Sequence, residues 1–301
     1  MNDSLSLSRR FFKGHGHGND YLVFEEGCGW SVEAATVRTV CHRWRGPGGD
    51  GIVALLAGEG PFGQRRPGNP FRLRMFNPDG TEFERSGNGL RVLGSYLFAR
   101  GRVRVGDPFP VEVGGDVVEM EILGRGGDGV VDVAVEMGHT RHGMAAVGGD
   151  PELLPEDRYL PGPDGDTLDI QPVSVGNPHC VAFREVLSEG DLLELGPFLT
   201  THPLFPNGVN VQLATPVGDG AVKILIWERG VGRTASSGTS ACAVASACVK
   251  RGMLDPGKIR VEMEGGDFFV TVAESGSVRL EGPVRPVMEG ELTVEFQKSL
   301  L

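Results

Sequence analysis

The stretch SGNGLRVLGSYLFARG at residues 86–101 occurs again in altered form as SGTSACAVASACVKRG at residues 237–252. In both copies Ser-Gly opens an apolar run, and Arg-Gly closes it 14 positions after the serine. Serine is a favoured N-cap and glycine a favoured residue just past a helix end, so each copy predicts a helix. The first helix shows one apolar face, marked by Leu90, Leu93 and Leu97. The second is apolar almost all round, which is typical of a helix buried on every side.

Two strand-like elements precede each helix in the same order. GNDYLVF at 18–24 matches GNPHCVAF at 176–183, and RLRMFN at 72–77 matches KILIWE at 223–228. In both halves, nine positions separate the last residue of the second element from the serine that opens the helix. Matched elements at matched intervals indicate an internal duplication. We therefore expect a pseudo-twofold protein that uses strand, glycine-rich loop and helix twice.

The length of 301 residues allows two domains of ordinary size. Because 47 glycines and 20 prolines occur without a repeat period, many turns must join short strands. We expect an α/β fold with two half-domains, 1–137 and 138–301, each with strands wrapped about a central helix. The boundary is placed where a strand-like run at 130–137 gives way to a polar stretch. A plain βαβ sheet is the alternative that the pattern leaves open.

Charge and cysteine content restrict the partners. The formal charge of −11 repels polyanions, which argues against nucleic acid and acidic membranes and favours a small zwitterionic or neutral ligand. The chain shows neither a signal-peptide pattern nor a membrane-spanning run, so we expect a cytoplasmic protein. Its five scattered cysteines include no CxxC, which argues for reduced thiols and against a structural zinc site. The His15-Gly16-His17 spacing lacks further ligands, and no metal is expected.

The two helix starts are the candidate functional site. The unpaired N–H groups of a helix N-terminus bind a carboxylate well. If the duplication makes the two starts face each other, groups on opposite sides of the adjacent carbon can remove and deliver a proton, which inverts a stereocentre. Ser86 and Ser237 can instead be simple N-caps, His179 a core histidine, and Glu228 with Arg229 a surface ion pair. A capping role does not explain why Ser86 and Ser237 stand at the same distance in sequence from the strand that precedes each of them.

These residues resemble the diaminopimelate epimerase family over nearly the whole chain. The resemblance rests on a set of short motifs in family order, at 13–20 (KGHGHGND), 49–51 (GDG), 77–80 (NPDG), 86–89 (SGNG), 176–179 (GNPH), 209–210 (VN), 228–230 (ERG) and 237–239 (SGT). It implies two pseudo-symmetric domains, each a strand-rich barrel around a central helix. It also implies an active site in the cleft between them, often a homodimer, and no cofactor. The implied activity is epimerisation of LL- to meso-diaminopimelate, in lysine and peptidoglycan biosynthesis.

The resemblance also implies roles for single residues. In that family one catalytic cysteine pairs with the GNPH histidine and the other with the ERG glutamate, which here gives Ser86 with His179 and Ser237 with Glu228. The substrate-binding residues that it implies are Asn19, Asn77, Gly87, Asn88, Asn177, Asn210, Glu228, Arg229, Gly238 and Thr239.

This sequence departs from the family pattern at the two catalytic cysteine positions and at two positions near them. Serine stands at both cysteine positions, Arg233 where the family usually has glutamate, and Ser240 where a glycine is frequent. A thiol has a pKa near 8.5 and an alcohol sits closer to about 15.7, so a serine base costs roughly 10 kcal/mol more to generate.

Four interpretations stay open. The first is an active epimerase or racemase that uses the serines, or His179 and Glu228 directly, as acid and base. The second is a related isomerase or dehydratase acting on a more acidic C–H. The third is a ligand-binding homologue without catalysis. The fourth is a deliberate double Cys→Ser variant, against which the changes at Arg233 and Ser240 speak.

Overall fold

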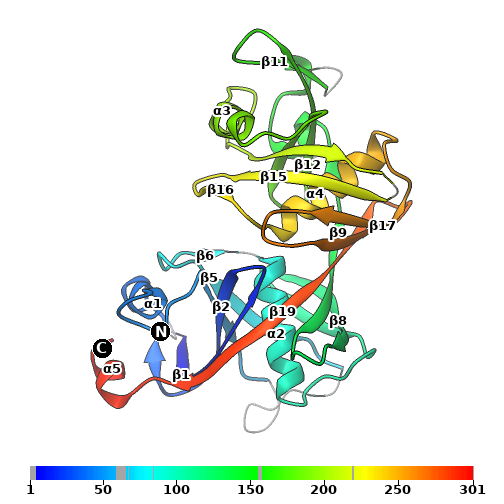
Figure 1. The fold of residues 1–301 in the computed structure, drawn as a ribbon. Coiled ribbons are helices and arrows are strands. Elements are labelled where there is room, and N and C mark those ends of the chain that lie inside the picture. Colours follow the sequence, from blue (N-terminus) through cyan, green and yellow to red (C-terminus); the bar gives the residue numbers. More distant parts are fainter. Residues whose placement is uncertain are drawn as a thin grey trace. The chain divides into compact units, whose positions relative to one another are not determined.

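The computed structural model describes residues 5–58, 66, 68–83, 85–154, 158–218 and 220–300 (Figure 1). The chain forms two compact units. The first unit comprises Met1–Glu136 and Gly282–Leu301, and the second comprises Met137–Glu281. Both boundaries fall inside long strands that pair with each other, β9 (Val131–His139) and β19 (Ser277–Glu291).

The sheet of the first unit closes on itself. Successive neighbours pair antiparallel, parallel, antiparallel, parallel and antiparallel, in the order β1 (Ser6–Gly16), β2 (Asn19–Glu26), β4 (Ile52–Leu55), β5 (Phe71–Phe76), β7 (Phe109–Val113) and β8 (Asp116–Arg125). Strand β8 pairs with β9, β9 with β19, and β19 with β1. Two short strands, β3 (Trp30–Ser31) and β6 (Glu82–Phe83), and two helices, α1 (Ala34–Cys41) and α5 (Val294–Lys298), also belong to this unit.

The second unit repeats this order of pairings. It uses β12 (Thr167–Ser174), β13 (Pro178–Phe183), β14 (Asn210–Pro216), β15 (Ala221–Glu228), β17 (Gly257–Glu262), β18 (Phe268–Val272) and β19. Smaller elements are β10 (Arg141–His142), β11 (Tyr159–Pro161), β16 (Gly232–Thr234), the 3-10 turns Met144–Val147 and Pro151–Leu153, and α3 (Glu189–Thr200). Just as β6 pairs with β5, β16 pairs with β15. The predicted duplication is confirmed strand by strand.

The two matched helices are α2 (Gly87–Ala99) and α4 (Gly238–Lys250), with Ser86 and Ser237 as their N-caps. Their C-termini share one hydrogen-bond pattern. Arg102 N–H reaches Leu97 O at 2.9 Å in the first, and Met253 N–H reaches Cys248 O at 2.9 Å in the second. Glycine stands at the left-handed position of both turns, with φ of 66° at Gly101 and 65° at Gly252. The predicted helix ends are therefore confirmed.

Both helices lie inside their barrels. Helix α4 contacts β12, β13, β14, β15, β17 and β18, and every residue from Ser240 to Cys248 is buried, as its composition predicted. The expectation of a single apolar face on α2 is wrong, because every residue from Gly87 to Leu97 is buried, including Arg91 and Ser95. Strands β1, β2, β4 and β8 all pack against α2, and its polar side chains are enclosed with the rest.

The last twenty residues correct the expected domain boundaries. The sequence assigned 138–301 to the second domain, whereas Gly282–Leu301 belongs to the first unit. Strand β19 pairs with β18 up to Glu281 and with β1 from Arg285 onward (Figure 1). Buried side chains such as Val284 and Leu292 then complete the core of the first unit. A pairing between residues some 270 positions apart leaves no local signal in the sequence.

The cysteines are free, as expected. Cys28 is exposed, and Cys41, Cys180, Cys242 and Cys248 are buried. In the described ranges, no helix combines the length and the apolar character that crossing a membrane requires.

Candidate active site

Ser86 caps helix α2. Its Oγ accepts a hydrogen bond from the Gly89 N–H at 3.1 Å, and its carbonyl accepts the first intrahelical bond from Leu90 N–H at 2.9 Å. The default capping role of serine therefore describes Ser86. The N–H groups of Gly87 and Asn88 precede the first intrahelical bond and stand at the positive end of the helix dipole.

Asn19 and Asn88 meet beside this helix start. Asn88 Nδ2 donates to Asn19 O at 2.6 Å and to Asn19 Oδ1 at 2.8 Å, and Asn88 Oδ1 accepts from Arg91 Nη2 at 2.9 Å. A Cβ on Gly16 would lie only 2.3 Å from Asn88 Oδ1. Glycine in the GHG motif is therefore required for this close approach.

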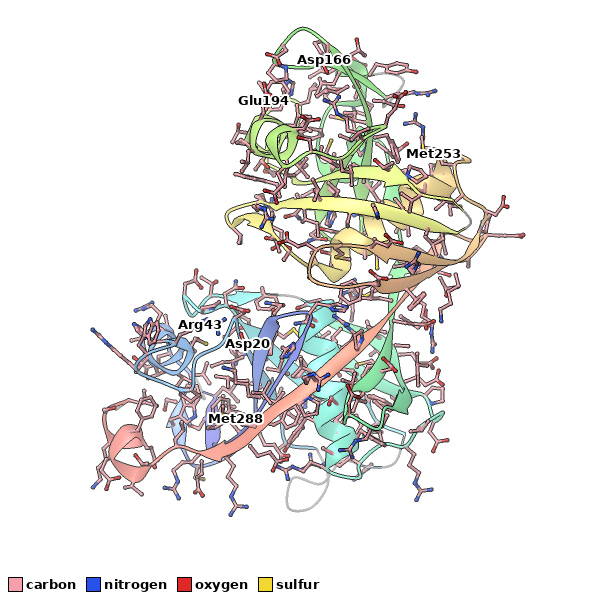
Figure 2. All side chains as sticks on the ribbon, in the orientation of Figure 1. Asp20, Arg43, Asp166, Glu194, Met253 and Met288 are labelled. Atoms are coloured by element: carbon pink, nitrogen blue, oxygen red, sulfur yellow. The ribbon has the colours of Figure 1, made fainter. Side chains whose placement is uncertain are left out.

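Behind Asn19 lies a cluster of charges that the sequence did not reveal. Asn19 Nδ2 donates to Asp50 Oδ2 at 3.0 Å, and Arg43 bridges Asp50 and Asp20 at 2.6 and 2.8 Å (Figure 2). Lys13 Nζ adds a contact with Asp20 at 2.8 Å. Burial alone would raise the pKa of Asp20, but the hydrogen bonds from Arg43 and Lys13 outweigh it and lower the pKa to about 2. The cluster holds Asn19 in place.

Asn77 follows β5 and lies in a turn of its own. Its Nδ2 donates to Thr81 Oγ1 at 3.0 Å, and its carbonyl accepts from Gly80 N–H at 2.9 Å. Its matched residue in the second unit is Glu228, which ends β15.

Ser237 differs from Ser86, because its side chain makes no capping hydrogen bond to α4. The Glu228 carboxylate accepts from Thr234 Oγ1 at 3.2 Å, and Ser237 lies near enough for its hydroxyl to lower the pKa of Glu228. Burial raises the pKa of Glu228, and Ser237 and Thr234 partly offset this. Ser237 Oγ also lies 3.5 Å from Thr239 Oγ1. Ser237 thus lies near its expected partner Glu228, and their catalytic pairing stays a prediction.

His179 is fully buried and held at both ring nitrogens. Nε2 lies 2.9 Å from Asn177 Oδ1, and Nδ1 lies 3.1 Å from Gln212 Nε2. Burial lowers the pKa of His179 to about 3; the hydrogen bond with Gln212 opposes this in part, and the charge of Arg229 lowers the pKa further. The imidazole is therefore neutral at pH 7. Its expected partner Ser86 belongs to the other unit.

The remaining expected residues of the second unit join the same hydrogen-bonded group. Asn177 Nδ2 donates to Thr239 Oγ1 at 3.5 Å, and Asn210 Oδ1 accepts from the Arg229 N–H at 3.0 Å. The Arg229 guanidinium donates to Asn207 O at 2.6 Å. Of these side chains, Asn177 contacts the first turn of α4 through Thr239, and the N–H groups of residues 238–240 there precede the first intrahelical bond. Such a start suits a carboxylate ligand.

Both positions that depart from the family pattern have partners. Arg233 pairs with Glu189 on α3 and with Glu264, the latter at 2.6 Å. Ser240 Oγ accepts from Gln212 Nε2 at 3.0 Å. Sequence reasoning missed Gln212, although a signal exists: it stands two positions after Asn210 in one strand, and so on the same face.

No three side chains among the His, Cys, Asp and Glu residues of the described ranges gather into a possible metal-ligand set.

Comparison with known proteins shows the family of this chain. Residues 11–143 and 172–287 match the family model for diaminopimelate epimerase. A diaminopimelate epimerase 2 of Nostoc sp. is 35% identical, covering 95% of this chain and 96% of the relative. A diaminopimelate epimerase of Pelotomaculum thermopropionicum is also 35% identical, covering 93% and 98%.

Solved structures share the fold at low sequence identity. A predicted epimerase of Pseudomonas aeruginosa has a TM-score of 0.67 at 19% identity, over 95% of this chain and 100% of that one. A hydroxyproline epimerase of Agrobacterium vitis has a TM-score of 0.65 at 16% identity, over 95% and 92%. Together with the family match over most of the length, these findings establish that the chain belongs to the diaminopimelate epimerase family of isomerases.

Proposed function

We propose that this protein is a cofactor-independent epimerase that inverts the α-carbon of an amino acid, and that its substrate is LL-diaminopimelate, converted to the meso form. The substrate assignment rests on the curated relatives, which carry that activity in their names at 35% identity. It is further supported by the presence of every residue that the family pattern uses for recognition, from Asn19 to Thr239.

The observation that carries the proposal is the buried Glu228 carboxylate near Ser237, the N-cap of α4, held by a hydrogen bond from Thr234 Oγ1 at 3.2 Å. The N–H groups of this helix start bind the reacting carboxylate, which places the adjacent Cα–H beside Ser237. Ser237 Oγ takes the Cα proton while its own proton passes to Glu228, a carboxylate whose pKa is raised by burial. Ser86 delivers its hydroxyl proton to the opposite face, and water returns a proton to the alkoxide that is left.

A substrate-binding homologue without turnover is the second candidate. It is favoured by the capping bond of Ser86, because an oxygen that accepts the Gly89 N–H is a weaker base. The recognition residues would then hold a ligand that does not react. A third candidate, an isomerase or racemase of another amino acid, uses the same residues on a different side chain.

Exchange of the α-hydrogen separates the candidates. The protein is incubated in D2O with LL- and meso-diaminopimelate, and deuterium at Cα is followed by NMR and mass spectrometry. Catalysed exchange with inversion supports the epimerase. Saturable binding in calorimetry without exchange refutes it in favour of the binding homologue, and exchange only with histidine, glutamate or hydroxyproline moves the substrate assignment to that amino acid.

Restoring the thiols tests whether the serines face the reacting carbon. The double variant Ser86→Cys/Ser237→Cys should raise the exchange rate by about 10²–10⁴-fold, the usual contribution of a matched acid–base group. Ser188→Cys is the matched control, since Ser188 caps α3 in the same way and lies outside the site. An unchanged rate in the double variant contradicts the assigned roles of both serines.

We also propose that the protein is a homodimer in the cytoplasm. This part of the proposal rests on the family resemblance alone. Light scattering coupled to size exclusion should give twice the chain mass of 32.1 kDa. A single-chain mass at micromolar concentration contradicts the dimer and leaves the catalytic proposal untouched.

A further inference from the structure

Gln212 is a fully buried polar residue on the inner face of the second barrel. Along β14 the side chains alternate, so that Val211 and Leu213 pack in one apolar cluster while Asn210 and Gln212 face the opposite way. On the neighbouring strand β13, Cys180 belongs to the same apolar cluster, which leaves His179 on the side of Gln212. The side chain of Gln212 is 0% exposed and lies between His179 and Ser240 on α4.

The orientation of the Gln212 amide follows from its contacts. Its Nε2 lies 3.1 Å from His179 Nδ1 and 3.0 Å from Ser240 Oγ, so both N–H bonds of the amide are used. Its Oε1 is buried without a hydrogen-bond partner in the described part of the chain. The reversed amide would leave two buried N–H donors unsatisfied instead of one acceptor, which is the less favourable arrangement.

This orientation decides which ring nitrogen of His179 carries the proton. A ring nitrogen that accepts from Gln212 has no hydrogen, so in the neutral imidazole the proton is on Nε2. Nε2 then donates to Asn177 Oδ1 at 2.9 Å. With its oxygen occupied, Asn177 turns Nδ2 toward Thr239 Oγ1 in the first turn of α4. A continuous chain of hydrogen bonds runs from Ser240 through Gln212 and His179 to Thr239.

We propose that Gln212, held by Ser240, is a positioning residue that fixes His179 in the neutral Nε2–H tautomer, so that His179 orients Asn177 and is not a proton acceptor. The role of this arrangement in catalysis rests on the proposed epimerase function. The assignment of the tautomer does not depend on that function. A second proton on His179 would have to enter at Nδ1 and displace the Gln212 amide. The burial that lowers the pKa of His179 acts in the same direction.

When matched positions of the two units are compared, the second unit has this arrangement and the first does not. Tyr21 occupies the place in the first GN motif that His179 occupies in the second. The strand β4 that corresponds to β14 is apolar throughout, from Ile52 to Leu55. The second copy of the duplicated unit thus has a histidine held by a glutamine and the first copy does not, so the two helix starts differ chemically.

The test is an NMR measurement on ligand-free protein. The full-length chain is labelled with ¹⁵N-histidine, and long-range ¹H–¹⁵N correlation at pH 7 identifies the protonated ring nitrogen; the His179→Gln variant assigns the signal. We expect a pyrrole-type Nε2 and a pyridine-type Nδ1. In Gln212→Glu the carboxylate accepts from Nδ1–H, so Nδ1 becomes pyrrole-type. In Gln212→Met the donor to Nδ1 is absent while the contact of Nε2 with Asn177 remains, so the population of the Nδ1–H tautomer should rise above that of wild type.

The control and the opposing outcomes are distinct from those of the activity assay. Gln171→Met removes another buried glutamine of the second unit, one that bonds to Pro172 O, and should leave the His179 pattern unchanged. A wild-type His179 protonated at Nδ1, or an imidazolium at pH 7, overturns the proposal even if every variant fails to fold. So does a Gln212→Met spectrum identical to that of wild type. Absence of epimerase activity leaves this result unaffected.

Discussion

At the scale of single residues, the two serines that the sequence presents as equivalent are held differently. Ser86 accepts a backbone N–H and works as a cap, whereas the Ser237 side chain makes no capping bond and lies near Glu228. An alcohol becomes a base only when a partner takes its proton as it reacts. On the described contacts that partner exists beside Ser237. Glu228 is therefore the residue whose ionisation should control the acid side of the pH–rate profile.

Thr234→Val tests this control. The change removes one of the two hydrogen bonds that lower the pKa of Glu228 against the effect of burial, so this pKa should rise further. Since the ionised carboxylate is the required form, activity is lost as pH falls through that pKa, and the acid limb of kcat/KM should move to higher pH.

Thr215→Val is the matched control, because Thr215 bonds to Arg184 O in the same unit and not to Glu228. A limb at the same pH in Thr234→Val and wild type would show that Glu228 is not the titrating base.

Asp20 is the residue whose charge should govern acid stability. Its folded pKa of about 2 lies below the ordinary value of 3.8, so its ionised form stabilises the fold above about pH 4. That contribution is lost as pH falls from 4 toward 2. Asp20→Asn should lower the free energy of unfolding by about 3 kcal/mol at pH 7, because Arg43 and Lys13 lose their partner.

The difference between wild type and Asp20→Asn, measured by urea titration at each pH, should therefore shrink below pH 4 and vanish near pH 2. Asp255→Asn, at an exposed position, should show no such dependence. A difference that persists at pH 2 contradicts the assigned cause.

At the scale of elements, helix length is set by end signals and burial by the strands around the helix. Ser-Gly and Arg-Gly locate the ends of α2 and α4 to the residue, because capping is a local interaction. Burial is not local. The α2 sequence carries Arg91 and Ser95 among its apolar residues, and the barrel encloses both.

The matched helix ends allow a paired prediction. Gly101 and Gly252 have φ near 65° with no atom within 4 Å of an added Cβ, so replacement by alanine costs backbone strain alone. Each of Gly101→Ala and Gly252→Ala should destabilise its own unit by about 1 kcal/mol, read from hydrogen exchange by mass spectrometry. Gly127→Ala, at an open position without positive φ, is the control. A cost several times larger in one unit than in the other would contradict equivalent ends.

At the scale of the whole molecule, the chain crosses between the units twice. The first crossing lies in β9 and the second in β19, which returns residues 282–301 to the first unit. Val284 is fully buried there although it follows the whole second unit in sequence. The first unit is thus completed only by the last residues of the chain.

Val284→Asp should therefore unfold the N-terminal half. An unpaired charge in the closed core should cost more than about 4 kcal/mol. We expect hydrogen-exchange protection to be lost in β1 and β2, with β13 and β14 protected as in wild type. Val117→Asp, at a valine of β8 that is 63% exposed, should change neither. If only residues after 137 lost protection, the assignment of the C-terminal strand would be wrong.

The sequence by itself determined the family, the duplication and the ends of both central helices, because these depend on short motifs and their spacing. Asn177, His179, Asn210 and Arg229 were named in advance as site residues; Asn177 contacts both His179 and Thr239, Asn210 contacts Arg229, and their roles stay predictions.

Tertiary structure alone decided the rest. The return of β19, the enclosure of Arg91, the Asp20–Arg43–Asp50 cluster behind Asn19 and the bond from Gln212 to His179 all join residues far apart in the chain. Such contacts form only when strands pair and a barrel closes, and no local propensity of the residues involved encodes them. The serines at the two helix starts were visible in the sequence, but their different chemical settings come from what the fold places beside each of them.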